Sequence, residues 1–343
     1  MLVDKYKTDF ATKVSPYLSP TSSAAYEGLQ IDEKSHLRFS AKQRLKAFDE
    51  EVERSATNPL ISTGFKGLDD ALGGGLYPSL YTLGAMPGAG KTSLVLQTAD
   101  NVAKSGNNVL ILSLEMSAHS LMGRSISRLT YELAQDKSQA KTYRDITDGR
   151  RYEQYSDEEL NLIKSARAKY EHIANHIYIY EGKEVRTLDS ITEVIKGFCE
   201  REGGQPLIIV DYVQIIEATT DRSSDKQNVD KAVYGLVDIS HKYALPVLMV
   251  SSINRASYSE SEKPIGLSSF KESGAIEFAS DVVMSLQFKA RNGLDSRISL
   301  ERSKRDIELV FLKNRNASLG EVVNLKFVEQ FTCFEEETRW ETN

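Results

Sequence analysis

A glycine-rich loop between an apolar strand pattern and an apolar helix pattern constrains the fold of this 343-residue chain more than any other feature. The loop is Ala85-Met86-Pro87-Gly88-Ala89-Gly90-Lys91-Thr92-Ser93, after the run Leu80–Leu83 and before Leu94–Leu96. Glycines let backbone N–H groups converge on phosphate oxygens, and a helix N-terminus adds its positive end. The P-loop pattern asks for glycine where Ala85 stands, with Gly84 one position earlier, and the rest of the pattern fits. The loop therefore predicts a nucleotide-binding α/β domain.

Short apolar runs alternate with helical stretches along the rest of the chain. The candidate strands are Leu80–Leu83, Val109–Leu114, Ile177–Tyr180, Leu207–Asp211, Val247–Ser251, Val282–Leu286, Ile307–Leu312 and Val322–Phe327. Continuous apolar strands separated by helices are typical of a buried, largely parallel sheet. Ser156 and Glu159 frame a capping box for one of the helices. The last strands follow each other without helices, so we expect a twisted, mostly parallel sheet flanked by helices, with an antiparallel edge.

The segment before the loop divides into a polar arm and one helix. Residues 1–36 show no clear period and are expected to be loosely ordered. From Leu37 to Arg54, apolar residues recur at helical spacing between charged ones, which is typical of an amphipathic helix with a narrow stripe. The stripe consists of Ala41, Leu45, Phe48 and Val52. Ser55–Pro59 then breaks the pattern, because proline disfavours helix in the residue before it.

Composition excludes several other classes of protein. Lys and Arg number 43 against 49 Asp and Glu, so the net charge of −6 rules out a globally basic nucleic-acid coat but not a local basic channel. The two cysteines and five histidines have no metal-ligand spacing, which excludes a disulfide scaffold and a Cys-based zinc site. No apolar run approaches the roughly 20 residues of a membrane span, and no signal-peptide core is visible. We expect a cytoplasmic protein without a membrane partner.

The loop makes ATP and Mg²⁺ the expected cofactors. Lys91 would hold the β- and γ-phosphates, and Thr92 would supply a hydroxyl to Mg²⁺. Asp211 ends an apolar strand and is the expected acidic partner of the metal. Glu115 follows a neighbouring strand, where a carboxylate would face the nucleotide crevice as general base, although an exposed or helix-capping glutamate would have the same spacing. The expected nucleotide-binding residues are Pro87, Gly88, Ala89, Gly90, Lys91, Thr92, Ser93 and Asp211.

Seven short segments carry an ordered set of motifs. They are Thr63–Asp69, the loop itself, Ser113–Met116, Asp211–Gln214, Ser251–Arg255, Lys271–Glu277 and Lys313–Asn316. In this order they resemble the C-terminal motor domain of the DnaB-type replicative helicases, from about Leu60 to the end. The resemblance implies that residues 60–343 form a RecA-like P-loop ATPase and helicase motor. Residues 1–59 would be an N-terminal arm and linker helix.

The resemblance also implies an assembly and a division of roles. It implies a ring, usually of six subunits, that encircles single-stranded DNA and moves along it with ATP in replication, with a possible separate primase or loader. It implies that Glu115 activates water, and that Lys313 and Arg315 reach the nucleotide of the adjacent subunit, Arg315 as an arginine finger. Lys313 and Arg315 stand at i and i+2 at a strand end, so both should point to the same side.

Three departures from the family pattern are visible. The family usually has Gln as γ-phosphate sensor where Ser252 stands, and the shorter serine is expected to loosen coupling between nucleotide and DNA. The large N-terminal domain of cellular helicases is expected to be missing, as in a shortened phage or mobile-element version; the helix at 37–54 resembles only the linker helix that packs on a neighbouring motor. Asn316–Gly320 replaces a Gly-Pro-containing turn, which we expect to be a minor change.

Two polar loops, Thr219–Lys231 and Asn254–Lys271, follow strands that should point into a ring's channel. Their candidate phosphate contacts are Arg222, Lys226, Arg255, Lys263 and Lys271. Acidic neighbours, namely Asp221, Asp225, Glu260 and Glu262, nearly cancel this charge. Charge alone therefore favours solvated loops, and only the resemblance favours DNA binding, which would be salt-sensitive.

Two alternatives to a helicase remain open. One is a non-helicase RecA-like ATPase, such as a recombination mediator or a regulatory switch, for which Ser252 leaves room. The other is an ATP-binding subunit that assembles on another helicase and hydrolyses little. The segment Lys271–Glu277 favours the helicase over the first alternative. The presence of Lys91, Thr92, Asp211, Glu115 and Arg315 argues against the second.

Overall fold

The structure is a computed structural model that describes residues 40–57, 60–217, 225–254, 265–270, 274–289, 304–317 and 320–337. The chain divides into two compact units, residues 1–59 and 60–343, and each is described by itself. In the first unit, helix α3 (Ala41–Thr57) covers most of the predicted amphipathic helix. It continues through Ser55–Thr57, so the predicted break after Arg54 is wrong, because proline restricts only the residue directly before it. Its apolar residues Leu45, Phe48 and Val52 are exposed. Residues 37–39, where the predicted helix begins, lie outside the described residues.

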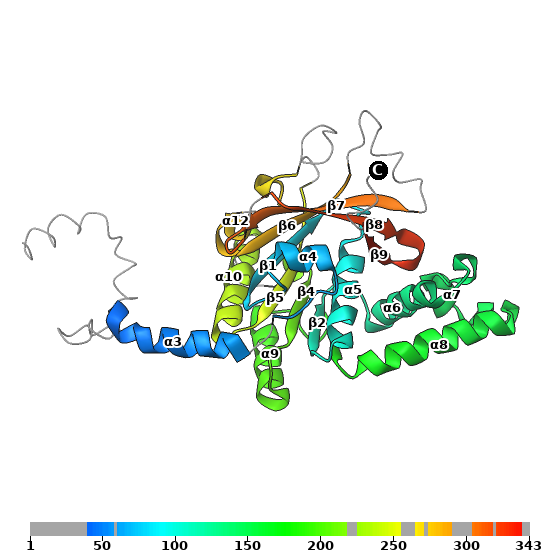
Figure 1. Ribbon diagram of the computed structural model, residues 1–343, viewed down its shortest axis with the longest axis horizontal. Coiled ribbons are helices and arrows are strands. Elements are labelled where there is room, and N and C mark those ends of the chain that lie inside the picture. The colour runs from blue at the N-terminus through cyan, green and yellow to red at the C-terminus, as the bar shows by residue number, and fades with distance from the viewer. Residues whose placement is uncertain are drawn as a thin grey trace, which may run out of the picture. The chain divides into compact units, whose positions relative to one another are not determined.

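A mixed sheet forms the centre of the second unit, with nine strands within the described residues (Figure 1). Its order is β3-β2-β4-β5-β1-β6-β7-β8-β9. The strands are β1 (Ser79–Ala85), β2 (Val109–Ser113), β3 (Ile177–Glu181), β4 (Leu207–Asp211), β5 (Pro246–Ser252), β6 (Val282–Phe288), β7 (Arg305–Asn314), β8 (Val322–Val328) and β9 (Cys333–Glu336). Strands β1 to β6 pair in parallel, and β7 to β9 extend the sheet in antiparallel fashion. All eight predicted strands and the antiparallel edge are confirmed; β9 was not predicted.

Helices cover both faces of the parallel strands. The α-helices of this unit within the described residues are α4 (Lys66–Ala71), α5 (Lys91–Lys104), α6 (Ala118–Leu133), α7 (Tyr143–Thr147), α8 (Asp157–Ala174), α9 (Leu188–Glu202), α10 (Asp225–Tyr243) and α12 (Gly274–Ala279). Along β2, Val109 and Ile111 pack into a core with α4 and α5, whereas Leu110 and Leu112 pack into a second core with α9 and α10. Successive strand residues point to opposite faces, so a strand with both faces buried must be apolar throughout. This packing explains the continuous apolar runs in the sequence.

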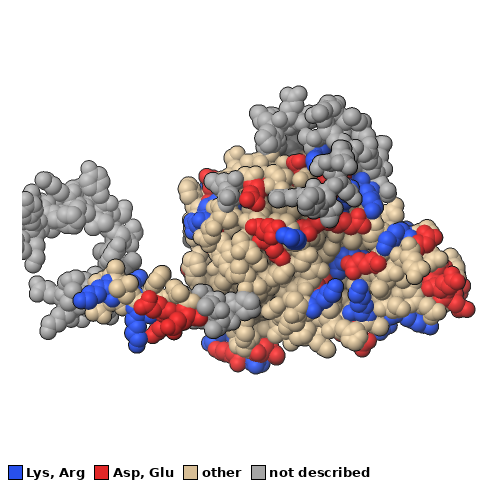
Figure 2. All heavy atoms as spheres, in the orientation of Figure 1, with Lys and Arg blue, Asp and Glu red and all other residues tan. Residues whose placement is uncertain are grey.

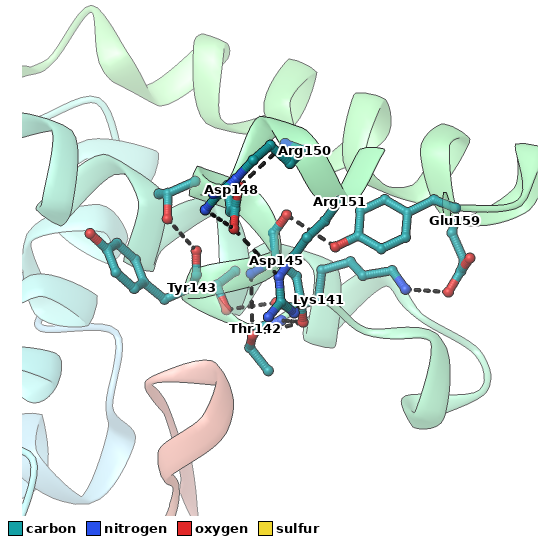
Figure 3. Close-up of polar contacts among 11 residues, drawn as sticks. Lys141, Thr142, Tyr143, Asp145, Asp148, Arg150, Arg151 and Glu159 are labelled. Carbon is teal, nitrogen blue, oxygen red and sulfur yellow. Dashed lines mark hydrogen bonds and ion pairs between the residues drawn. The ribbon is translucent and has the colours of Figure 1, made fainter. Parts of the chain in front are cut away.

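Helices α6, α7 and α8 form a lateral subdomain next to the parallel strands (Figure 1). The predicted capping box is present, because the Ser156 side chain accepts from the Glu159 backbone and the Glu159 side chain accepts from the Ser156 backbone. Lys141 forms an ion pair with Glu159, and Arg151 forms one with Asp145 (Figure 3). Partial burial opposes ionisation of Asp145, but hydrogen bonds from Thr142 and Arg151 outweigh it and hold the pKa of this carboxyl below its ordinary value. The first pair joins the residues before α7 to α8, and the second joins α7 to the short helix η5 (Gly149–Gln154) that follows it; neither was predicted.

The parallel register brings four strand ends to one edge of the sheet. Ala85 at the end of β1 pairs with Ser252 at the end of β5, and Ser113 at the end of β2 pairs with Asp211 at the end of β4. In open α/β sheets, ligands bind outside the carboxyl ends of such strands. Within the described residues, no helix has the length and apolar character needed to cross a membrane.

Candidate nucleotide-binding site

The glycine-rich loop joins β1 to α5 with two glycines in the left-handed region. Gly88 has a φ of 80° and Gly90 a φ of 90°, where residues with a side chain are strained. A Cβ on Gly90 would also lie 2.8 Å from the rings of Phe327 and Phe334, so this position needs glycine for space as well. Ala85, where the P-loop pattern has glycine, is the last residue of β1 and has a strand conformation that alanine adopts without strain.

A cleft of about 1010 Å³ lies over this loop. It is lined by every predicted loop residue except Ala89, which is buried, and also by Glu115 and Ser252. The structure therefore brings together residues that are up to 165 positions apart in the chain (Pro87 to Ser252). Four lining residues lie outside both the loop and the seven motif segments: Arg124, Phe327, Glu329 and Thr332. They come from α6 and from the β8–β9 region, and nothing in the local sequence around them indicates a cleft.

Asp211 and Thr92 form a polar pair at the floor of the site. The Thr92 hydroxyl donates to Asp211 Oδ2 at 2.9 Å, and Asp211 is only 4% exposed. Burial raises the pKa of the Asp211 carboxyl, against the opposing effects of the Lys91 charge and the Thr92 hydrogen bond. Asp211 Oδ1 is buried and has no hydrogen-bond partner within the described residues. A buried carboxylate oxygen without a donor, next to a hydroxyl, fits a hard cation such as Mg²⁺.

Lys91 and Glu115 lie in the same cleft. The Lys91 ammonium lies 4.9 Å from the centre of the Tyr212 ring, a cation–π distance that keeps the charge next to Asp211. Glu115 is exposed after β2. The helix-capping alternative for Glu115 is not realised, because α6 is capped by Ser117 and its first N–H, from Ala118, donates to Glu181. The Glu115 carboxylate is thus available to the cleft.

Ser252 is tied to the segment that follows Asp211. The Ser252 backbone N–H donates to Gln214 Oε1 at 3.2 Å, and Gln214 Nε2 donates to the Ser251 hydroxyl at 2.8 Å. Gln214 belongs to the short helix η6 (Val213–Ile215). The amide of Gln214 therefore links the segment that follows β4 to the end of β5.

Lys313 and Arg315 lie away from the loop of their own chain, toward the amino end of β1. Lys313 pairs with Val283, which pairs with Thr82, three residues before Ala85 on β1 and hence about 10 Å from it. Both side chains donate to the carbonyl of Phe278, at 3.2 Å from Lys313 and 2.8 Å from Arg315, so they point to one side as predicted. The structure does not bring these two cations to their own cleft.

Arg315 is held in place by a buried carboxylate. Its NH1 donates to Asp281 Oδ1 at 2.9 Å, and its backbone N–H donates to the Asp281 carbonyl at 3.1 Å. The Arg315 side chain nevertheless remains 50% exposed. Burial and the neighbouring Arg315 charge lower the pKa of Lys313.

Four of the five predicted DNA contacts lie outside the described residues, and one lies within them. Arg222, Arg255, Lys263 and Lys271 lie outside the described residues, and Lys226 is exposed in the first turn of α10. On the face shown in Figure 2, Lys and Arg are interspersed with Asp and Glu across the described residues. The described surface in this view therefore gives no independent support for a nucleic-acid channel.

Comparison with known proteins gives a consistent result. A replicative DNA helicase DnaB of Geobacillus stearothermophilus is 29% identical over 279 residues, which are 80% of this chain and 56% of that protein. A replicative DNA helicase DnaC of Bacillus subtilis is 29% identical over 280 residues, again 80% of this chain and 56% of that protein. This chain therefore spans little more than half the length of these relatives.

Solved structures show the same fold at lower identity. One of them, an isolated ATPase domain, has a TM-score of 0.71 and 21% identity, and the match covers 87% of this chain and 99% of that one. A DnaB-like replicative helicase, described with its interactions with primase, also has a TM-score of 0.71, with 20% identity over 98% of this chain and 76% of that one. The profile of the DnaB-like helicase C terminal domain family matches residues 61–336. This chain therefore belongs to the DnaB-like helicase C-terminal domain family.

Proposed function

We propose that this protein is an ATP-dependent, ring-shaped DNA helicase that moves along single-stranded DNA in replication. The observation that carries the proposal is the division of the candidate catalytic groups between two ends of the sheet. Lys91, Thr92 and Glu115 line the cleft, whereas Lys313 and Arg315 lie at the other end. A head-to-tail ring of identical subunits would bring the second end of one subunit to the cleft of the next. Membership of a helicase family supports DNA as the polymer along which the protein moves.

The residues of the cleft suit the hydrolysis of ATP. Thr92 and Asp211 would hold Mg²⁺, which would supply positive charge to neutralise the phosphates. Lys91 would exchange the Tyr212 ring for the phosphate chain, since a triphosphate attracts an ammonium more strongly than a ring face does. Glu115 would orient the attacking water and accept its proton. Ser252 would lie nearest to the γ-phosphate at the tip of β5.

Arg315 would act on the neighbouring subunit's nucleotide. Its guanidinium is half exposed and pre-oriented by Asp281, so little side-chain entropy remains to be lost when a neighbour docks. Arginine fingers contribute about 10³–10⁵ to the rate in NTPases that use them. We expect Lys313 to add positive charge at the same interface between subunits.

Helix α3 would hold the ring together. An isolated helix of this length is marginal in water, and its exposed apolar stripe calls for a surface. Burying Leu45 and Phe48 on a neighbouring motor would contribute about 1.5–3 kcal/mol each. Residues 1–59 would then serve as arm and linker, and residues 60–343 as motor. We propose a homo-oligomeric ring, most simply a hexamer, that works in the cytoplasm with a separate primase or loader.

The DNA contacts of the proposed helicase are Arg222, Lys226, Arg255, Lys263 and Lys271, on the two loops that would face the channel. Strand displacement on forked DNA with either a 5′ or a 3′ single-stranded tail tests the function. ATP turnover is measured in parallel with and without single strands. We expect ATP-dependent displacement of one fork polarity. ATP turnover with no displacement of either fork would contradict the helicase and favour a non-helicase RecA-like ATPase.

A further inference from the structure

The antiparallel edge of the sheet supports the phosphate loop from behind. The Phe327 and Phe334 rings stack with centroids 4.4 Å apart directly against Gly90. Gln97 of α5 donates to the Phe334 carbonyl at 2.9 Å and accepts from its N–H at 2.7 Å. Strands β8 and β9 thus fix both the loop and the helix that follows it. A third contact comes from β7, and it reaches the loop backbone itself.

That third contact is made by Arg305, the first residue of β7. Arg305 NH1 donates to the Gly88 carbonyl at 3.0 Å, and its NH2 forms an ion pair with Glu329. Arg305 is only 6% exposed and does not line the cleft. A charge this deeply buried requires strong partners, and the carboxylate and the carbonyl are two of them. Neither Arg305 nor Glu329 belongs to the seven segments that carry the family resemblance.

The contact fixes one peptide group of the loop on both sides. The oxygen of the Gly88–Ala89 peptide accepts from Arg305, and the N–H of the same peptide donates to the Met86 carbonyl at 3.1 Å. Gly88 lies in the left-handed region, and glycine loses more conformational freedom on ordering than any other residue. A loop that is ordered before the phosphates arrive loses less of this entropy on binding.

We infer that Arg305 is a positioning residue of the nucleotide site, oriented by Glu329, that presets the phosphate loop through the Gly88 carbonyl. It acts through the backbone and not by touching the phosphates. Glu329 is half exposed and lines the cleft, so it connects the buried guanidinium to the space that the nucleotide would occupy. The inference rests on the proposed function only in requiring that the cleft binds a nucleoside phosphate.

The test measures equilibrium binding of two fluorescent probes, mant-ADP with Mg²⁺ and mant-adenosine, to the full chain. We expect Arg305→Gln to weaken mant-ADP about tenfold and mant-adenosine less than twofold, because only the phosphate chain contacts the loop. In ATP turnover the same variant should raise KM about tenfold and change kcat less than about threefold. Arg305→Lys keeps a charged donor and should recover part of the loss. Lys304→Gln is the matched control, since Lys304 is the adjacent residue and pairs with Glu335 instead.

The binding results separate the positioning role of Arg305 from the proposed function. Equal mant-ADP affinity for wild type and Arg305→Gln, within twofold, overturns the positioning role while leaving the proposed function intact. Equal losses for the two probes, or for Arg305→Gln and Lys304→Gln, overturn it as well, because they indicate general damage. A wild type that binds no mant-ADP refutes both the inference and the proposed function. If circular dichroism shows that Arg305→Gln does not fold, Arg305→Lys and Glu329→Gln decide: unchanged mant-ADP affinity in both contradicts the inference.

Discussion

The two ends of strand β1 differ in what they offer a ligand. At the carboxyl end, Lys91 lines a cleft and lies over an aromatic ring, and beside Thr92 of the same cleft a buried Asp211 oxygen has no hydrogen-bond partner in the described residues. At the amino end, Arg315 and Lys313 already donate to the Phe278 carbonyl, and Arg315 also to Asp281. The first end is suited to receive a phosphate chain, and the second is suited to present cations to a molecule outside the subunit. Under the proposed function, the two ends would be the two parts of a catalytic centre, and the structure does not bring them together within one chain.

The same strand also connects the two ends. The Leu80 N–H donates to Asp281 Oδ2 at 3.1 Å, while Asp281 Oδ1 accepts from Arg315. Five residues after Leu80, the phosphate loop begins at Ala85, the last residue of β1. Asp281 thus joins the amino end of β1 to Arg315 through its two carboxylate oxygens. Substitutions at one end at a time therefore test what each end contributes.

The largest effect is expected from removing the Lys91 ammonium from the cleft. Lys91→Ala should lower ATP turnover by at least about a hundredfold, since the ammonium would neutralise the phosphates. Its folded-state contact is with the Tyr212 ring at the cleft and not with the core, so circular dichroism should not change. Lys104→Ala, at the exposed end of the same helix, is the control and should behave as wild type. Unchanged turnover in folded Lys91→Ala would refute the phosphate-loop assignment.

Asp211→Asn should have opposite effects on activity and stability. Loss of the carboxylate should abolish Mg²⁺-dependent tightening of nucleotide binding, which titration with and without Mg²⁺ measures. Burial raises the pKa of Asp211 in the folded state, so the ligand-free protein loses stability as pH rises above the ordinary pKa of an aspartate and the buried group ionises. Asn removes this cost. We expect the melting temperature of Asp211→Asn to be a few degrees higher than that of the wild type at pH 7 and equal to it at low pH. A lower melting temperature of the variant at pH 7 would contradict a cost of ionising the buried Asp211 carboxyl.

A smaller effect is expected at Ser252, next to Ala85 in the sheet. A serine hydroxyl is about two carbons shorter in reach than a glutamine amide. ATP hydrolysis in the wild type should therefore depend only modestly on single-stranded DNA, and Ser252→Gln should increase the stimulation a few-fold. Strong stimulation in the wild type that the substitution removes would assign the sensor role to another residue, such as Gln214 or Asn254.

Sequence alone was sufficient for the parallel sheet and the loop because both depend on local patterns. A strand with both faces buried is apolar throughout, and a phosphate loop has fixed glycine spacing. Strand β9 was missed because Cys333–Glu336 is short and half acidic, and its pairing with Leu325–Val328 of β8 decides its conformation. Tertiary context of this kind overrides local preference.

The parts of the candidate site that could not be predicted are contacts between distant segments. Arg305 and Gly88 are 217 residues apart, and Glu329 and Thr332 enter the cleft only because the antiparallel edge folds back over the loop. Asp281 lies 34 residues before Arg315, and no spacing rule links an aspartate before one strand to an arginine after the next.

Mixing two inactive variants tests the division between the two ends most directly. Arg315→Ala keeps an intact cleft, and Lys91→Ala keeps an intact arginine, so in randomly mixed rings about a quarter of the joints regain both groups. We predict that each variant alone hydrolyses ATP at no more than about a hundredth of the wild-type rate. A one-to-one mixture should recover a substantial fraction of the wild-type rate, well above the rate of either variant alone. No recovery at any ratio, in rings shown by light scattering and subunit exchange to be mixed, would contradict the claim that Arg315 completes the site of a neighbouring subunit.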